Sequence, residues 1–131
     1  MSSASVPHVV RAVWQQDHHD CAVAATAMLC GVDYPTALAA FTRPAQVLRE
    51  GVSPWAEFRR ACRRLGVQTR VKRRPDLEHD TGILYVTDDE HGHVCLLWEG
   101  RIVDGDGMLW LFVVDYLQHR GMTAHTLLER V

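Results

Sequence analysis

Two short segments of the sequence carry residue types used in nucleophilic catalysis. Cys21 follows the polar run 15–20 and opens an apolar segment that predicts a helix over 21–30. The unpaired N–H groups and the dipole at a helix start favour negative charge, and therefore the thiolate that acts as the nucleophile. His93 begins a predicted strand just after a turn, where its imidazole can reach a cleft. We therefore expect Cys21 to be a nucleophile and His93 to be its acid–base partner.

A third group is needed to orient the histidine, and two aspartates are candidates. If residues 99–100 form a two-residue turn, the hairpin pairs His93 with Asp106 and puts Asp104 diagonal to His93. All three side chains then lie on one face of the sheet. Geometry alone leaves either carboxylate as the third member.

A catalytic cysteine also needs hydrogen-bond donors for the oxyanion. Gln15 and Gln16 lie just upstream of Cys21. A glutamine side-chain N–H and the backbone N–H of Cys21 would together make a two-donor oxyanion hole.

The segment 15–25 resembles the active-site motif of the papain-like peptidases that remove double-glycine leaders from bacteriocins. In that family a glutamine lies six residues before the cysteine, an aspartate precedes it, and small residues follow. Gln15, Asp20 and Cys21 match this pattern, although Ala22 replaces the usual glycine.

The later part of the chain resembles the same family. Segment 92–97 is similar to its Gly-His strand, with Val94 in place of the usual aromatic residue. Asp104, followed by Gly105, stands where the family has Asp-Pro, and an Asp-Tyr-Leu helix is expected at 115–118. The similarity extends to nearly the whole chain.

The resemblance implies a papain-like α+β fold, with N-terminal helices packed on a C-terminal antiparallel sheet. It implies hydrolysis of a peptide bond through a thioester acyl-enzyme, with the triad Cys21, His93 and Asp104 and with Gln15 in the oxyanion hole. Asp106 remains the alternative third member. The substrate would be a peptide or protein, with small residues such as glycine before the cut, and no metal or organic cofactor would be required.

Other interpretations of these residues stay open. Cys21 could be a buried structural thiol, or the chain could be an inert binding module of the same fold. An amidase, isopeptidase or acyltransferase would use the same triad. His18, His19, His91 and His93 could also join cysteines in a zinc site, but their spacing lacks the usual zinc motifs.

The remaining pattern predicts helices first and strands later, which indicates an α+β class. Helices are predicted over 21–30, 34–41 and 53–65, and strands over 67–71, 82–87, 93–98, 101–104 and 123–128. The segment 109–120 contains a strand or a short helix. The run 108–112 is interpreted as a core strand, with a dimer or partner surface as the alternative.

Length and composition set broad limits. The chain has 131 residues, 47% hydrophobic and 23% charged, which predicts one domain over 1–131 with a flexible start at 1–8. The net charge of -2 gives no whole-molecule attraction to nucleic acid or anionic membranes. No run approaches the ~20 apolar residues of a membrane span, and no secretory signal is recognised, so we expect a cytoplasmic protein with four free thiols. Nothing indicates the oligomeric state.

A basic cluster is interpreted as the solvated face of a helix and an exposed loop. It lacks the interleaved aromatic residues expected of a nucleic-acid site, and an acidic protein partner is the favoured alternative. Its members are Arg59, Arg60, Arg63, Arg64, Arg70, Lys72, Arg73 and Arg74.

Overall fold

The computed structural model describes residues 20–51, 55–105 and 108–131. Over these residues the fold is α+β, as predicted, with five helices and one six-stranded antiparallel sheet. The helices are α1 (Cys21–Cys30), α2 (Tyr34–Ala40), α3 (Pro44–Glu50), α4 (Trp55–Arg64) and α5 (Val113–Arg120). The strands are β1 (Thr69–Lys72), β2 (Thr81–Thr87), β3 (Gly92–Trp98), β4 (Arg101–Val103), β5 (Leu109–Trp110) and β6 (Thr123–Arg130).

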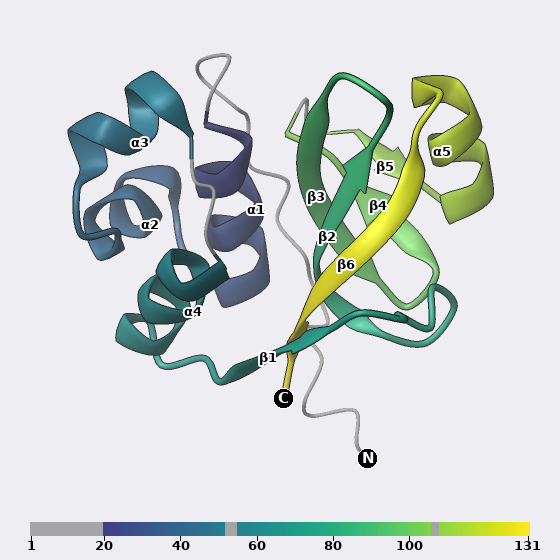
Figure 1. The fold of residues 1–131 in the computed structure, drawn as a ribbon. Coiled ribbons are helices and arrows are strands. Elements are labelled where there is room, and N and C mark those ends of the chain that lie inside the picture. The colour runs from purple at the N-terminus through teal and green to yellow at the C-terminus, as the bar shows by residue number, and fades with distance from the viewer. Residues whose placement is uncertain (1–19, 52–54, 106–107) are drawn as a thin grey trace.

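Helices α1 to α4 gather on one side of the sheet, and α5 lies on the other side (Figure 1). The strand order is β1-β6-β2-β3-β4-β5, and every neighbouring pair is antiparallel. The helical group meets the sheet through α1, which packs against β3 and β2, and through α4, which contacts β1. Helix α5 contacts β4 and β5 at the far end of the sheet.

Helix α1 is the central element of the core. Its alanine, leucine and methionine residues favour helix, and Gly31 ends it in the left-handed conformation, with φ of 69°. Residues 22–29 are all buried, since the sheet covers one face and α2 and α4 cover the other.

The side chain of Asp20 connects the first two helices. Asp20 is at the N-cap position, but its side chain makes no capping hydrogen bond. Its Oδ2 instead accepts a buried hydrogen bond from the Tyr34 hydroxyl at 2.5 Å. The side chain therefore ties α1 to α2.

The hairpin of β3 and β4 has the predicted register. Glu99 and Gly100 form its turn, with φ of 47° and 85°, as a two-residue hairpin turn requires. Trp98 pairs with Arg101, and two further residue pairs follow. The ladder ends there, so Asp104 stands directly after β4, where its backbone N–H donates to the carbonyl of Met108 at 3.2 Å.

Alternation along β3 divides its side chains between two cores. Val94 and Leu96 pack in the cluster shared with α1 and α4. Cys95 and Leu97 pack in the cluster shared with α5. The sheet is therefore buried on both faces at its centre, and the start of β3 lies at the rim of both clusters.

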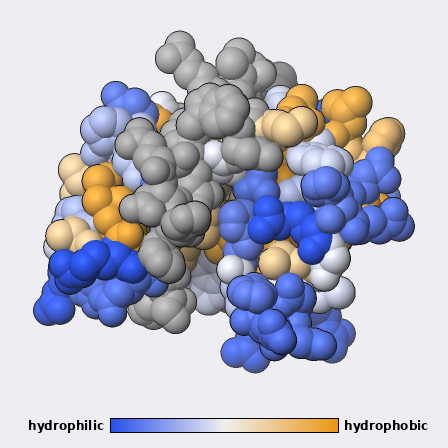
Figure 2. Space-filling model, turned by 90° about the horizontal axis from the view of Figure 1, so that it is seen from above, coloured by the Kyte–Doolittle hydropathy of each residue, from blue (hydrophilic) through white to orange (hydrophobic). Residues whose placement is uncertain are grey.

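The prediction of a core strand over 108–112 is wrong. Only Leu109 and Trp110 pair with β4, and Leu111 and Phe112 are 62% and 65% exposed. Figure 2 shows apolar residues on the α5 side of the molecule, where this segment lies. The exposed apolar residues there are Met108, Leu109, Leu111, Phe112 and Val114.

Among the described residues, no single helix is long and apolar enough to cross a membrane. Helices α1 and α2 pass that test only when taken together, and they are bent by 104° at the break between them.

Candidate active site

Cys21 is the first residue of α1 and is partly buried. The carbonyl of Asp20 accepts hydrogen bonds from the N–H groups of Val23 and Ala24, at 3.0 and 3.1 Å, so the helix begins at the cysteine. The first N–H groups of a helix have no partner within the helix. The thiol therefore stands at the electropositive end of α1, where a negative charge is stabilised.

His93 is the second residue of β3, and only 13% of its side chain is exposed. Its Nε2 lies 2.6 Å from Oδ1 of Asp104, and the N–H at Nε2 donates to that carboxylate. Cys21 is the second group that acts on the ring, because its hydrogen bond and its charge both raise the pKa of His93. His93 therefore joins the helix to the sheet.

The surroundings of His93 favour its protonated form. Burial lowers the pKa of His93, but hydrogen bonds to Asp104 and Cys21, together with their negative charges, outweigh burial and raise the pKa to about 9. At neutral pH the ring is therefore a cation that faces the Asp104 carboxylate through Nε2 and also interacts with Cys21.

Asp104 is 4% exposed and is surrounded by donors. Its Oδ1 accepts from His93 and, at 2.6 Å, from the N–H of Gly105. Its Oδ2 accepts from the Tyr116 hydroxyl at 2.8 Å and from Arg120 at 3.3 Å. Burial alone would raise the pKa of Asp104, but the hydrogen bonds and charge of His93, with the other donors, lower it below its ordinary value. The carboxylate therefore stays ionised.

Tyr116 and Arg120 on α5 are members of this network that the sequence analysis missed. Burial, followed by the charges of Cys95 and Asp104, raises the pKa of Tyr116, so its hydroxyl stays protonated and donates. Arg120 also lies over the Tyr116 ring, at 6.0 Å from its centroid. The sequence did contain a signal for both residues, because a helix was expected after Asp104. Tyr116 and Arg120 are four residues apart, and residues three or four apart share one face of a helix.

The three other cysteines are free thiols, as predicted. Burial raises the pKa of Cys95, which is therefore a core residue and not a second nucleophile. Cys30 and Cys62 interact with each other: their hydrogen bond lowers the pKa of Cys30, and the same bond, with burial, raises that of Cys62. Cys30 is thus the natural reference thiol for any test of Cys21.

Two predicted site residues, Gln15 and Asp106, lie outside the described residues, and so do His18 and His19. Their roles therefore stay predictions. Among the described histidines, cysteines and carboxylates, no group of three or more is placed to hold a metal ion. His91 instead lies beside Asp88, with Nδ1 3.6 Å from Oδ1.

The described residues thus bring together a thiol at a helix start, a histidine and a carboxylate from three separate segments. Such an arrangement can supply a nucleophile, a proton donor for a leaving group, and a group that fixes the histidine ring. Comparisons with protein families, with curated proteins and with solved structures found no match to this chain.

Proposed function

We propose that this protein is a papain-like cysteine peptidase that hydrolyses a peptide bond. The observation that supports the proposal most is the contact of Cys21, at the start of α1, with the His93–Asp104 pair on the sheet. A buried structural thiol has no need of an ionised histidine beside it. The resemblance of the two motifs to bacteriocin-leader peptidases adds the expectation of small residues, such as glycine, before the cut.

The steps follow from the protonation states of the three groups. The Cys21 thiolate attacks the carbonyl carbon of the peptide, and the negative charge moves to the carbonyl oxygen. The backbone N–H of Cys21, and by proposal the side chain of Gln15, stabilise that oxyanion. The C–N bond breaks as His93 gives its proton to the departing amine, leaving a thioester.

Water completes the reaction. His93, now neutral, accepts a proton from a water molecule as the water oxygen attacks the thioester carbonyl. The C–S bond breaks, the acid product leaves, and the Cys21 thiolate and protonated His93 are restored. Throughout both halves Asp104 accepts the hydrogen bond from Nε2, which holds the ring with its other nitrogen toward the sulfur.

The test is the pH dependence of iodoacetamide alkylation, read separately for each cysteine by peptide mass spectrometry. We expect Cys21 to react below pH 7, and to lose that reactivity in His93→Ala, because the imidazolium stabilises the thiolate. Cys30 serves as the internal control, since its lowered pKa does not depend on His93. If Cys21 alkylates like an ordinary thiol, or equally in both proteins, the peptidase proposal fails and an inert binding module replaces it.

A substrate panel separates the peptidase from related enzymes that would use the same triad. Linear peptides, isopeptides and cell-wall peptides are incubated with the wild-type protein and with Cys21→Ala. The proposal requires Cys21-dependent cleavage of a linear peptide. Cleavage confined to isopeptides or to cell-wall peptides would reassign the reaction while keeping the triad.

A further inference from the structure

A groove of about 400 Å³ lies between the first turn of α4 and the edge of the sheet formed by β1 and β6. It combines two aromatic rings, an aliphatic side chain, a hydroxyl and a guanidinium. The residues that line it are Trp55, Val71, Arg73, His125 and Thr126. None of them belongs to the proposed triad.

The groove is connected to the active site by one aromatic residue. The ring of Tyr85 meets the ring of His125 edge-on, with centroids 5.6 Å apart. At its other end Tyr85 covers Gly92, where an added Cβ would lie 2.4 Å from the tyrosine hydroxyl. Gly92 directly precedes His93. Cys21, Trp55 and Tyr85 also pack, partly exposed, against the same core cluster between helices and sheet.

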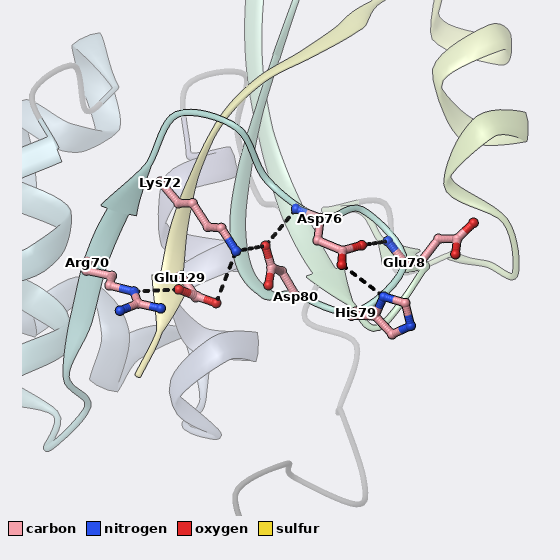
Figure 3. A network of polar contacts seen from close by, with 7 residues as sticks. All are labelled: Arg70, Lys72, Asp76, Glu78, His79, Asp80 and Glu129. Carbon is pink, nitrogen blue, oxygen red and sulfur yellow. Dashed lines mark hydrogen bonds and ion pairs between the residues drawn. The ribbon is translucent and has the colours of Figure 1, made fainter.

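The charges around the groove indicate the chemistry of its ligand. Arg70 is paired with Glu129 at 2.7 Å and Lys72 with Asp80 at 2.8 Å, as Figure 3 shows. Arg73 and Arg74 follow them, and neither has a carboxylate partner among the residues described. Only Arg73 lines the groove.

One further cation lies on the helix that carries Trp55. Arg59 is exposed and follows Trp55 by one helical turn, so both residues lie on the same side of α4. Among the described residues, the partly aromatic groove is lined by one arginine, Arg73, and by no carboxylate. Such a groove suits a ligand with an acidic side chain. Arg73 would bind its carboxylate, and its methylene groups would pack against Trp55 and Val71.

We propose that this groove is a substrate subsite that binds an acidic side chain of the peptide undergoing cleavage. The inference rests on the proposed peptidase function and adds to it the class of substrate, a peptide with glutamate or aspartate outside the scissile bond. It also gives a specific role to one member of the basic cluster, while its neighbours Arg70 and Lys72 hold the sheet edge together.

The test measures peptide binding by a variant that lacks the proposed nucleophile and therefore does not cleave the peptide. ¹⁵N-labelled Cys21→Ala protein is titrated at low salt with acetyl-(Glu-Ala)₃-amide and with acetyl-(Gln-Ala)₃-amide, and amide shifts are followed by NMR. The alternating sequence offers a side chain at every second residue, so an extended peptide can place one in the groove in any register. We expect shifts centred on Arg73, His125 and the Trp55 indole, and about fivefold tighter binding of the glutamate peptide, the size of one exposed ion pair.

Two matched variants decide the result. Arg73→Gln, in the Cys21→Ala background, should bind both peptides equally, whereas Arg74→Gln should keep the preference for glutamate. Equal binding of the two peptides by the parent protein, shifts centred elsewhere, or a preference that survives Arg73→Gln would each overturn the subsite. Because this readout needs no catalysis, it is independent of the alkylation test, and a failure of the subsite can be told apart from a failure of the peptidase proposal.

Discussion

The protonation of His93 connects the candidate site to the stability of the fold, and the substitution His93→Gln measures that connection. The pKa of His93 is about 9 in the folded protein and ~6.5 in an unfolded chain. The two values differ by ~2.5, which corresponds to ~3 kcal/mol of unfolding free energy. Only 13% of the side chain is exposed, so solvent screening takes little from this figure.

The sign follows from which state binds the proton more tightly. The folded state has the higher pKa, so the stabilisation is complete at pH values below ~6.5 and is lost as the pH rises through ~9. At pH 7.5 roughly 2 kcal/mol should remain, and at pH 9.5 almost none. Glutamine keeps a side chain of similar size at the same place without a titrating group.

The assay is urea unfolding of the wild-type protein and of His93→Gln at pH 5.5, 7.5 and 9.5. Titrating groups that do not contact His93 cancel in the difference between the two unfolding free energies, which leaves the histidine and its interactions with Asp104 and Cys21. We expect that difference to fall by ~3 kcal/mol between pH 5.5 and 9.5. A difference that stays constant within ~0.5 kcal/mol, or that grows with pH, would refute the reasoning that the site holds an imidazolium.

Three other substitutions test separate parts of the structure. Asp104→Asn removes the negative charge beside His93, so the pKa of His93 should fall by at least ~1, as measured by an NMR titration. An unchanged pKa would show that the carboxylate is not the main partner of His93. Glu99→Asn should raise the unfolding free energy by ~0.5 kcal/mol, because asparagine tolerates the positive φ of this turn better than glutamate does; a loss of stability in thermal melts would contradict this. Gly82→Ala should cost more than ~2 kcal/mol or prevent folding, since its Cβ would lie 2.1 Å from the carbonyl oxygen of Leu128, and wild-type stability would show that β2 and β6 are not so close.

Local signals predicted the elements that carry the candidate triad. The bounds of α1 follow from its composition and from Gly31, because both act within the helix itself. The hairpin register follows from the turn at 99–100, since a two-residue loop fixes which residues face each other. Spacing alone therefore put both Asp104 and Asp106 within reach of His93, and the family resemblance selected Asp104, which is hydrogen-bonded to the ring.

Elements that depend on distant contacts were not predicted. Helix α3 has seven residues and buries only Val47, so it has almost no periodic pattern, although Pro44 and Gly51 mark its two ends. Asp20 stands at the N-cap position of α1, but its side chain accepts a hydrogen bond from Tyr34, which depends on the packing of two helices. Hydropathy could not predict that Phe112 is exposed either. The hydropathy of a residue depends on its type alone, whereas its exposure depends on which other residues cover it.

The position of β6 has a consequence for the time order of assembly during synthesis. This strand, made after every other described strand, lies between β1 and β2 and pairs with both. While the ribosome is still adding residues 123–130, the hairpin of β2 and β3 can form, but β1 has no strand beside it and the α1 face lacks Leu128. Closing a loop from β1 to β6 is slow in comparison with hairpin formation. The nascent chain should therefore expose its sheet interior until translation has passed this strand, and it should need protection from aggregation until then.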